Sequence, residues 1–537
     1  MASRLSRQVF SRYWEVHATF GVITSLVLYV MFFLGAVVLF FRPLSVWEEP
    51  LLQQPAPDLT PLTSVDVPLA LAAPLPEEFY YYLPEDGLGL PKIGYYLPGT
   101  TLWRMWWLDP LRHAVIPKRE MAASYAYDLH YLWHDVTGYW LQYGGGILVF
   151  GFLLALVTGV LIHLHNLRRQ LQQFRPFQQM RVLFSDLHKV LGVFGLPFQL
   201  VYALTGTLMV LSPLLFSLAV GPVFGGDLTQ AARTAGALVE DAPALSYGVR
   251  QDALPLSTLI ARARQAEPRL EPEMFHFAGF GRAEGTVDVI GQVRGQTFGD
   301  GRVRMRATDG EVLLIETPDR EPAVAVVARW IHGLHTVHYG GLTARLLLFF
   351  LALCACITIL TGNWIYIERR RSHAPGITSL LARLTVGVGA GAIVAVVALL
   401  LASRLLPMEL QDRVAREEQM LAATFGLCVL YALCRKRPLS VWWQLLGCAG
   451  LLCAPIPWLA ARLSPAGLLG TGPHLAPVVG VDVALCLASV LLLAGAFALR
   501  RKARRSSPET PTDHALSHPM QTNQSTHPAA EIQAAHD

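Results

Sequence analysis

Apolar residues along this chain gather in eight long blocks, separated by polar segments of very different length. A helix needs about 20 apolar residues to cross the hydrocarbon core of a membrane, and most of the blocks reach that length. The expected spans are residues 17–41, 142–165, 188–213, 341–367, 383–405, 419–434, 440–461 and 477–499. The pattern therefore predicts an α-helical polytopic membrane protein with about eight transmembrane helices.

The composition agrees with a membrane protein. Of the 537 residues, 53% are hydrophobic and only 15% are charged, which is less charge than a soluble protein of this size carries. The net charge of +4 is small, and membrane lipid rather than nucleic acid is the expected partner. The first block lacks a small-residue cleavage site, so it is expected to remain as a retained first helix. All seven cysteines lie in or beside apolar blocks, which favours buried thiols over a disulfide framework.

Basic residues orient the expected helices. Positively charged residues of short loops stay on the cytoplasmic side of a membrane, and five basic clusters fall on one side of the expected spans. The clusters contain Arg4, Arg7 and Arg12; Arg168, Arg169, Arg175 and Arg181; Arg369, Arg370 and Arg371; Arg435, Lys436 and Arg437; and the run from Arg500 to Arg505. The opposite short loop, 408–419, is mixed and slightly acidic. Both termini are therefore expected in the cytoplasm.

Two long segments are expected on the outer side. The first, residues 42–128, is rich in Pro, Tyr and Trp, and its alternation predicts short strands. The second, 221–330, starts with a helical pattern at 256–268 and continues with strand patterns, with Asp309-Gly310 as a hairpin turn signal. A helix followed by an antiparallel sheet predicts a small α+β domain in this second segment.

The first four spans carry an internal duplication. His17 opens one apolar block and His188 opens another, and each is followed by glycines at the same two spacings. The helix that comes next also repeats, LVTGVLIHLHNLRR in the first copy and ILTGNWIYIERRR in the second. The equivalent glycines are Gly21 and Gly192, Gly35 and Gly206, and Gly159 and Gly362. Thr-Gly pairs recur at 158–159, 205–206 and 361–362, where close helix packing is the expected role.

Histidines at both ends of the duplicated spans point to haem. Haem iron takes axial imidazole ligands, and two of them leave no open site for oxygen chemistry. Ionisable residues in or near spans are costly, so a functional role is their default interpretation. We expect His17 with His188 at the cytoplasmic face and His130 with His335 at the outer face, with His134 and His338 as alternative ligands or propionate partners. The competing interpretation is that these rings only reach the membrane interface.

The sequence contains no motif that indicates a soluble cofactor. The chain has no GxGxxG fingerprint, no P-loop and no nucleophile motif of a hydrolase. If the protein is a reductase, its electrons come from an unidentified donor, which could be a partner, a quinol or a loosely bound carrier. No catalytic residue is assigned.

The chain resembles the bacterial PepSY-associated transmembrane proteins, also described as iron-regulated membrane proteins. The resemblance rests on VHATFGV at His17, DLHKVLGVFGLPFQLVYALTG at His188, WIHGLHTVHYGGLTARLLLFFLAL at His335 and the outer segment 256–316. It covers roughly residues 10–371. The motif LHYLWHDVTGYW is a loose match, so the choice between His130 and His134 stays open.

This resemblance implies a multi-pass protein of the bacterial inner (cytoplasmic) membrane. Members include di-haem reductases that release iron from ferric siderophores in the periplasm. By resemblance, electrons would pass from the cytoplasmic side through two b haems to a ferric siderophore or another periplasmic acceptor. The four C-terminal spans are an addition that the four-span core does not require.

The expected organisation joins the duplicated core, a periplasmic PepSY-like insertion and four extra helices. Its parts are an N-terminal segment with the first span, 1–41; a periplasmic segment, 42–128; the second and third spans with a basic loop, 129–220; a PepSY-like α+β domain, 221–330; the fourth span, 331–371; a four-span module, 372–505; and a disordered cytoplasmic tail, 506–537.

Two other functions compete with a haem reductase. A non-enzymatic binding or regulatory protein would use the PepSY-like domain as its binding module and the spans as an anchor. A transporter would use the duplicated hairpins as parallel repeats, but the absence of Asp, Glu or Lys from the middle of the spans argues against an ion-coupled site.

Overall fold

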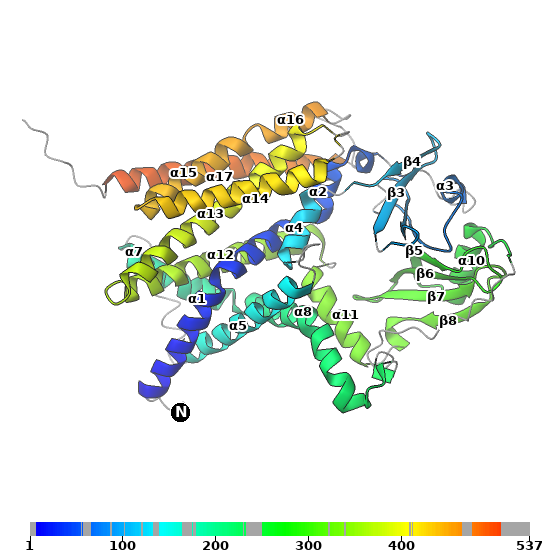
Figure 1. Ribbon diagram of the computed structural model, residues 1–537, viewed down its shortest axis with the longest axis horizontal. Coiled ribbons are helices and arrows are strands. Elements are labelled where there is room, and N and C mark those ends of the chain that lie inside the picture. The colour runs from blue at the N-terminus through cyan, green and yellow to red at the C-terminus, as the bar shows by residue number, and fades with distance from the viewer. Residues whose placement is uncertain are drawn as a thin grey trace, which may run out of the picture.

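The protein is a bundle of long helices with a β-sheet beyond one end of the bundle (Figure 1). This computed structural model describes residues 7–54, 56, 66–85, 89–100, 102–119, 122–132, 139–163, 174–175, 179–228, 230–231, 250–320, 323–337, 340–407, 410, 412–463 and 475–505. The tail 506–537, expected to be disordered, lies outside the described residues, as do His134 and His338.

Eight spans within the described ranges are long and apolar enough to cross a membrane, which confirms the polytopic fold. They are α1 (Arg7–Val38), α5 (Tyr139–His163), α8 (Leu196–Phe224), α12 (Gly341–Arg370), α13 (Pro375–Leu405), α14 (Arg413–Cys434), α15 (Pro438–Cys453) with α16 (Ile456–Leu463), and α17 (Ala476–Arg505).

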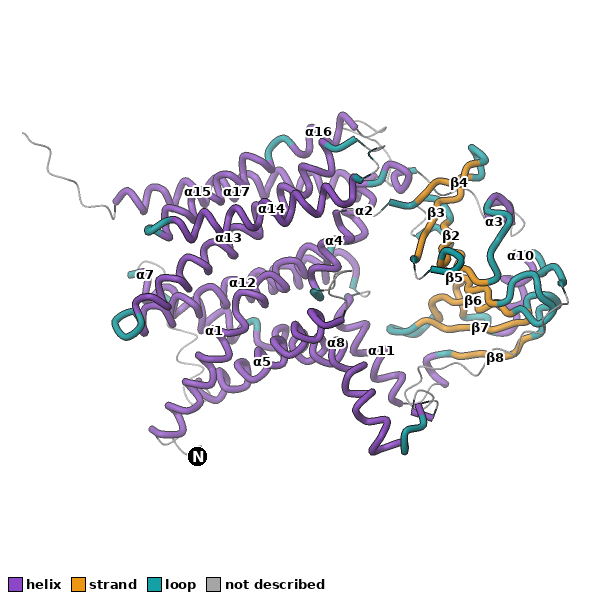
Figure 2. Tube along the Cα trace, viewed as in Figure 1, coloured by secondary structure: helices purple, strands orange, loops and turns teal. Residues whose placement is uncertain are grey.

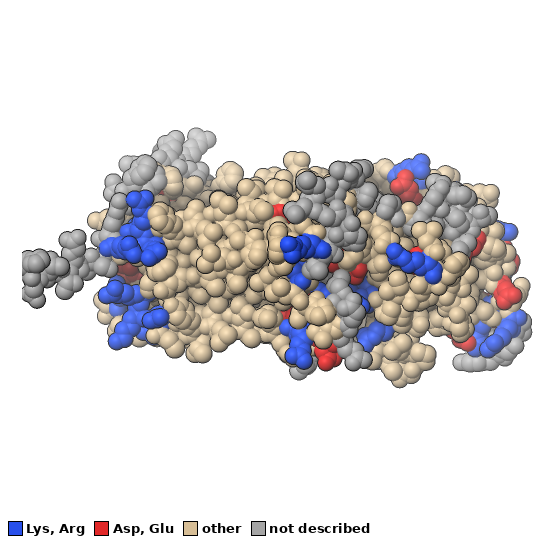
Figure 3. All heavy atoms as spheres, turned by 90° about the horizontal axis from the view of Figure 1, so that it is seen from above, with Lys and Arg blue, Asp and Glu red and all other residues tan. Residues whose placement is uncertain are grey.

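Charge is distributed along the bundle as a membrane protein requires. Figure 3 shows a wide band of uncharged surface, with Lys and Arg clustered at the end of the bundle away from the sheet. Exposed basic residues at this end include Arg12, Arg181, Arg370, Arg435, Lys436 and Arg500. We call this the arginine side of the bundle and the opposite one the sheet side.

The third span begins later than the apolar pattern predicts. The expected span 188–213 is broken at Gly195, which ends the separate amphipathic helix α7 (Met180–Phe194). Pro197, in the first turn of α8, cannot donate a backbone hydrogen bond and would clash with the carbonyl four residues earlier. His188 therefore lies on α7, and the span is Leu196–Phe224.

The histidines of the sheet side also lie outside the spans. His130 is the last residue of α4 (Ala122–His130), and His335 lies near the end of α11 (Ala323–Thr336). Histidines were expected at both ends of the duplicated spans, but those of the sheet side lie on separate short helices. Both short helices pack instead against the first spans of the duplicated pairs, α4 against α1 and α11 against α8.

The two outer segments form one eight-stranded antiparallel sheet. The strands are β1 (Glu78–Tyr82), β2 (Lys92–Tyr96), β3 (Trp103–Asp109), β4 (Ala114–Pro117), β5 (Leu270–Ala278), β6 (Thr286–Val293), β7 (Asp300–Arg306) and β8 (Val312–Glu316). Their order is β4-β3-β2-β1-β5-β6-β7-β8, so β1 beside β5 joins the segments. The sequence predicted strands in both segments but not this junction.

The sheet separates two apolar layers. Phe79 and Tyr81 of β1 point to the face that α10 (Leu256–Ala266) covers, and Leu259 of α10 is fully buried against them. Trp107 lies on the other face and packs with Trp47 of α2 (Phe41–Glu48). In Figure 2 the helix bundle accordingly lies on one side of the strands and α10 on the other.

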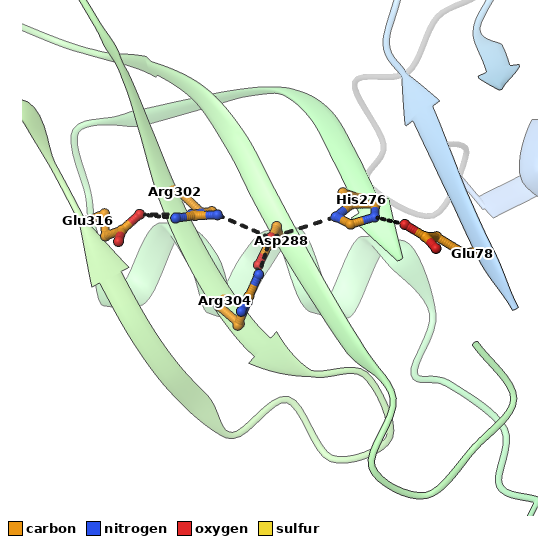
Figure 4. A network of polar contacts seen from close by, with 6 residues as sticks. All are labelled: Glu78, His276, Asp288, Arg302, Arg304 and Glu316. Atoms are coloured by element: carbon orange, nitrogen blue, oxygen red, sulfur yellow. Dashed lines mark hydrogen bonds and ion pairs between the residues drawn. The ribbon is translucent and has the colours of Figure 1, made fainter. Parts of the chain in front are cut away.

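A polar network crosses the bundle-facing side of the sheet (Figure 4). Asp288 of β6 is buried and receives hydrogen bonds from Arg304 at 2.6 and 2.7 Å, while His276 of β5 joins it to Glu78 of β1. Burial alone would raise the pKa of Asp288, but hydrogen bonds from Arg304 and His276 and the charges of the arginines outweigh burial and lower the pKa to about 2. The network therefore ties β1 to β5, β6 and β7.

The order of elements repeats along the first 370 residues. In the first copy, α1 is followed by α2, the short η1 (Pro50–Gln53) and α3 (Asp66–Leu71), then by strands β1 to β4, α4 and α5. In the second copy, α7 and α8 are followed by α10, strands β5 to β8, the short η3 (Pro318–Arg320), α11 and α12. The duplication seen in the spans thus extends through the sheet.

The C-terminal helices form a module packed on this duplicated core. Most side chains of α13 are buried, between α14 and α15 on one side and α12 and α1 on the other. The Tyr29 hydroxyl of α1 donates a hydrogen bond of 2.7 Å to the Gly389 carbonyl of α13. On the sheet side, Arg404 donates to the Trp47 carbonyl at 2.7 Å and stacks 3.7 Å above its ring.

Candidate functional site

The histidines of the arginine side lie face to edge between the two copies. The ring centroids of His17 and His188 are 6.0 Å apart, with an interplanar angle of 70°. The Nδ1 atom of His17 is 2.8 Å from the Ala155 carbonyl of α5, and that of His188 is 2.8 Å from the Thr358 carbonyl of α12. Each ring is therefore held by the second span of its own copy.

The histidines of the sheet side form an equivalent pair. The ring centroids of His130 and His335 are 6.2 Å apart. His130 Nδ1 is 2.8 Å from the Met31 carbonyl of α1, and His335 Nδ1 is 2.8 Å from the Thr205 hydroxyl of α8. Here each ring is held by the first span of its own copy.

These hydrogen bonds fix the tautomer of all four rings. A carbonyl oxygen only accepts, so the Nδ1 atoms of His17, His188 and His130 carry the hydrogen. The Thr205 hydroxyl gives its own hydrogen to the Val201 carbonyl at 2.7 Å, so His335 Nδ1 must also donate. Every Nε2 atom therefore keeps a free lone pair, the form in which imidazole binds a metal.

Burial keeps the sheet-side pair neutral. His130 and His335 lie on helices outside the spans, and burial lowers the pKa of both, that of His335 to about 3. A neutral imidazole is the ligating form.

Four glycines make room for the four rings. A Cβ atom at Gly35 would lie 2.7 Å from Cε1 of His130, and one at Gly362 would lie 3.0 Å from Cε1 of His188. The corresponding distances are 3.1 Å from Gly159 to His17 and 3.5 Å from Gly206 to His335. These glycines therefore accommodate the histidine rings.

The recurring Thr-Gly pairs lie beside the same histidine rings. The Thr158 hydroxyl lies 3.1 Å from the Ala155 carbonyl that accepts from His17, and Thr361 lies 3.0 Å from the Thr358 carbonyl that accepts from His188. Thr205 contacts His335 directly. The expectation of simple helix packing missed this role, although the repetition of Thr-Gly in both copies was the available signal.

The arginine-side pair lines a cavity of about 450 Å³. Its walls are mainly apolar, with Leu28, Phe152 and Ile359 at the deep end. Trp14 and Arg369 lie at the opposite end, where the guanidinium stacks 4.8 Å from the indole ring. The size falls in the range of cofactor pockets, and the wall is of the kind that a macrocycle with charged propionates requires.

Both pairs fit a metal held between two imidazoles. An iron–nitrogen bond of about 2 Å plus the ring radius of about 1.1 Å, taken twice, gives roughly 6 Å between ring centroids. The two observed separations, 6.0 and 6.2 Å, agree with that value. The donor set therefore fits bis-histidine haem at both places.

Other histidines lie outside the pairs. His163 lines the cavity of the arginine side, and His332 is exposed one turn before His335. His134 and His338 lie outside the described residues. Among the described candidates, His130 rather than another ring of the first copy faces His335.

Contacts from α2 and from the C-terminal module hold the helix that carries His130. Glu48 accepts hydrogen bonds of 3.1 Å from the first two backbone N–H groups of α4. Tyr125 of α4 donates its hydroxyl hydrogen to the Val414 carbonyl of α14 at 2.9 Å. Burial raises the pKa of Glu48 to about 7, against the opposing hydrogen bond from Ala123 and the charge of Arg404. No pattern in the sequence predicts these contacts.

Fold and site together define a polytopic membrane protein with two histidine pairs, one near each end of a duplicated helix core. Comparison with known proteins identifies the family. The sequence model of the PepSY-associated TM region matches residues 14–369. The chain therefore belongs to the family of PepSY-associated transmembrane proteins. It is also 30% identical over 380 residues to the Uncharacterized protein PA4219 of Pseudomonas aeruginosa, which covers 67% of this chain and 92% of that protein.

Proposed function

We propose that this protein transfers electrons across the bacterial inner membrane through two b haems and reduces an acceptor in the periplasm. His17 and His188 would hold one haem at the arginine side, and His130 and His335 the other at the sheet side. When bound, each haem supplies a one-electron Fe(III)/Fe(II) couple. The proposal is carried by one observation: four histidines with Nδ1 engaged form two pairs at the centroid spacing of bis-histidine haem.

The residues of this chain provide the rest of the pathway. The 18 residues from His17 to Gly35 correspond to about 27 Å of helix, so the pairs lie near opposite faces of a hydrocarbon core of about 30 Å. By the positive-inside rule, the basic clusters support a cytoplasmic arginine side, with both termini on that side. Electrons would enter there from a donor of unknown identity.

The acceptor would be reduced beneath the sheet. Tyr80, Tyr82 and Trp103 lie half-buried on the sheet face that looks toward the bundle. Family resemblance favours a ferric siderophore as acceptor. Reduction favours iron release because Fe²⁺ binds hard oxygen ligands less tightly than Fe³⁺.

The test is a reduced-minus-oxidised spectrum of the purified full-length protein, with a haem-to-protein ratio. We expect two low-spin b haems per chain, one lost in His188→Ala and the other in His335→Ala. His332→Ala changes an exposed ring on the same helix as His335 and should keep both. A folded wild-type protein without haem would refute the proposal and make the outer sheet, as a binding module, the remaining candidate.

Substrate reduction needs a second measurement. Protein reconstituted into vesicles and reduced from the arginine side should release Fe²⁺ from a ferric siderophore on the sheet side, detected with a ferrous chelator. Both His188→Ala and His335→Ala should abolish the release. Release that persists in either variant would contradict a route through both pairs.

A further inference from the structure

The four histidine rings differ in the group that accepts the hydrogen bond from Nδ1–H. Three Nδ1–H groups donate to helix carbonyl oxygens, whereas that of His335 donates to the Thr205 hydroxyl. A carbonyl is the stronger acceptor, and a stronger hydrogen bond at Nδ1 makes the Nε2 atom a more basic ligand. The arginine-side pair thus has two strong acceptors, and the sheet-side pair has one.

The difference follows from how closely each ring approaches its helix. At Gly35, Gly159 and Gly362, the ring lies within 3.1 Å of the position a Cβ atom would occupy, but at Gly206 the distance is 3.5 Å. His335 therefore stands farther from its helix, and the Thr205 hydroxyl stands between the ring and the backbone.

The Thr205 hydroxyl has one hydrogen-bond donor and one hydrogen-bond acceptor as its partners. Its oxygen accepts from His335 at 2.8 Å while its hydrogen goes to the Val201 carbonyl at 2.7 Å. Thr205 is 4% exposed, so bulk water does not compete for these bonds. Beside the two arginine-side histidines, Thr158 and Thr361 instead donate to the carbonyl that already accepts from the histidine.

We propose that Thr205 is a positioning residue that gives His335 a weaker hydrogen-bond acceptor than the helix carbonyls at the other three rings, so that His335 is the weaker iron ligand and electrons pass from the arginine-side pair to the sheet-side pair. This inference rests on the proposed function. A more basic imidazole stabilises Fe(III) over Fe(II) and lowers the reduction potential, so the pair with two carbonyl acceptors is the stronger reductant. In the transfer, one electron is lost at the arginine-side iron, Fe(II) to Fe(III), and gained at the sheet-side iron, Fe(III) to Fe(II).

The experiment is a potentiometric titration of the full-length protein with its haem, followed in the visible spectrum. His335→Ala identifies which wave belongs to the sheet side. In the wild type that wave should lie at the higher potential. Thr205→Val keeps the shape but removes the acceptor, so this wave should move to a still higher potential while the other stays in place.

Two further variants separate hydrogen bonding from packing. Thr205→Ser restores the hydroxyl and should return the sheet-side wave toward the wild-type potential. Thr207→Val removes a buried hydroxyl of the same helix that bonds only to the Ala203 carbonyl among the contacts the structure describes, and it should move neither wave.

The outcomes distinguish this inference from the proposed function. Two haems whose sheet-side wave lies at the lower potential, or does not rise in Thr205→Val, would overturn the role of Thr205 and leave haem binding intact. A wild-type protein without haem would overturn the proposed function itself.

Discussion

Replacement of Gly35 by alanine tests whether the histidine rings are seated on glycines. A Cβ atom there would lie 2.7 Å from Cε1 and 3.0 Å from Nδ1 of His130. An ordinary contact of about 3.4 Å would require the ring to move by about 0.7 Å. That movement would lengthen the 2.8 Å hydrogen bond to the Met31 carbonyl to about 3.5 Å, beyond the usual range.

The expected cost can be worked out from these distances. Overpacking costs about 1–3 kcal/mol and the lost hydrogen bond about 1 kcal/mol, while alanine returns up to about 1 kcal/mol of helix propensity. A net loss of about 2 kcal/mol corresponds to about thirtyfold weaker binding at the sheet-side pair. We therefore expect Gly35→Ala to lose the sheet-side haem selectively and to keep the other.

The chain offers two matched controls for this variant. Gly21 lies on the same helix with nothing within 4 Å of a Cβ position, and Gly206 faces His335 at an ordinary contact distance of 3.5 Å. Both alanine variants should retain two haems per chain in the pyridine haemochrome assay. If Gly35→Ala binds haem as the controls do, the ring of His130 is not held against Gly35 and the reasoning fails.

Three other substitutions test the supports of the site. Glu48→Ala leaves two N–H groups of α4 without their acceptor, so it should destabilise by about 1–3 kcal/mol and loosen the sheet-side haem before the other, measured by haem loss on warming. Asp288→Asn should lower the free energy of unfolding by about 2 kcal/mol at pH 7, because a pKa lowered from 3.8 to about 2 is worth about 1.4 kcal/mol per unit. That contribution is present above a pH of about 4 and is lost as the pH falls through about 2, so tryptophan fluorescence should give the two proteins equal stability only below that pH. Tyr29→Phe should cost about 1 kcal/mol in thermal unfolding through the lost bond to Gly389, and an unchanged midpoint would show that the bond does not join α1 to α13.

The spans could be predicted from the sequence because they depend on local chemistry. A membrane demands long apolar runs, and the basic clusters mark their ends, so the number of spans was predictable. The pairing of His17 with His188 was also anticipated, since a duplicated chain brings equivalent residues to equivalent places. Their role as ligands stays a prediction.

Long-range geometry could not be predicted in the same way. Strands β1 and β5 pair although some 190 residues separate them. The sequence patterns of these two strands would equally have suited the edges of two separate sheets. The residues directly on both sides of Gly195 are apolar, so hydropathy alone does not reveal the break there. The glycine seats depend on which helix lies opposite each ring, and the sequence contains only the repetition of Thr-Gly as a trace of them.

Each histidine ring is held by its own copy of the duplicated core but paired with a ring of the other copy, and this explains why the duplication matters. Each histidine is hydrogen-bonded within its own copy, to α5 or α1 in the first and to α12 or α8 in the second. Each pair, however, takes one ring from either copy, so neither half of the core can complete a site alone. The junction of β1 with β5 and the packing of α1 on α12 hold the two halves together at both ends of this interface. The C-terminal module contacts mainly α12, α2 and α1, and through Tyr125 it also holds α4, the helix that carries His130 and is only nine residues long. The extra helices are thus placed to stabilise the pair that a short helix alone would hold least firmly.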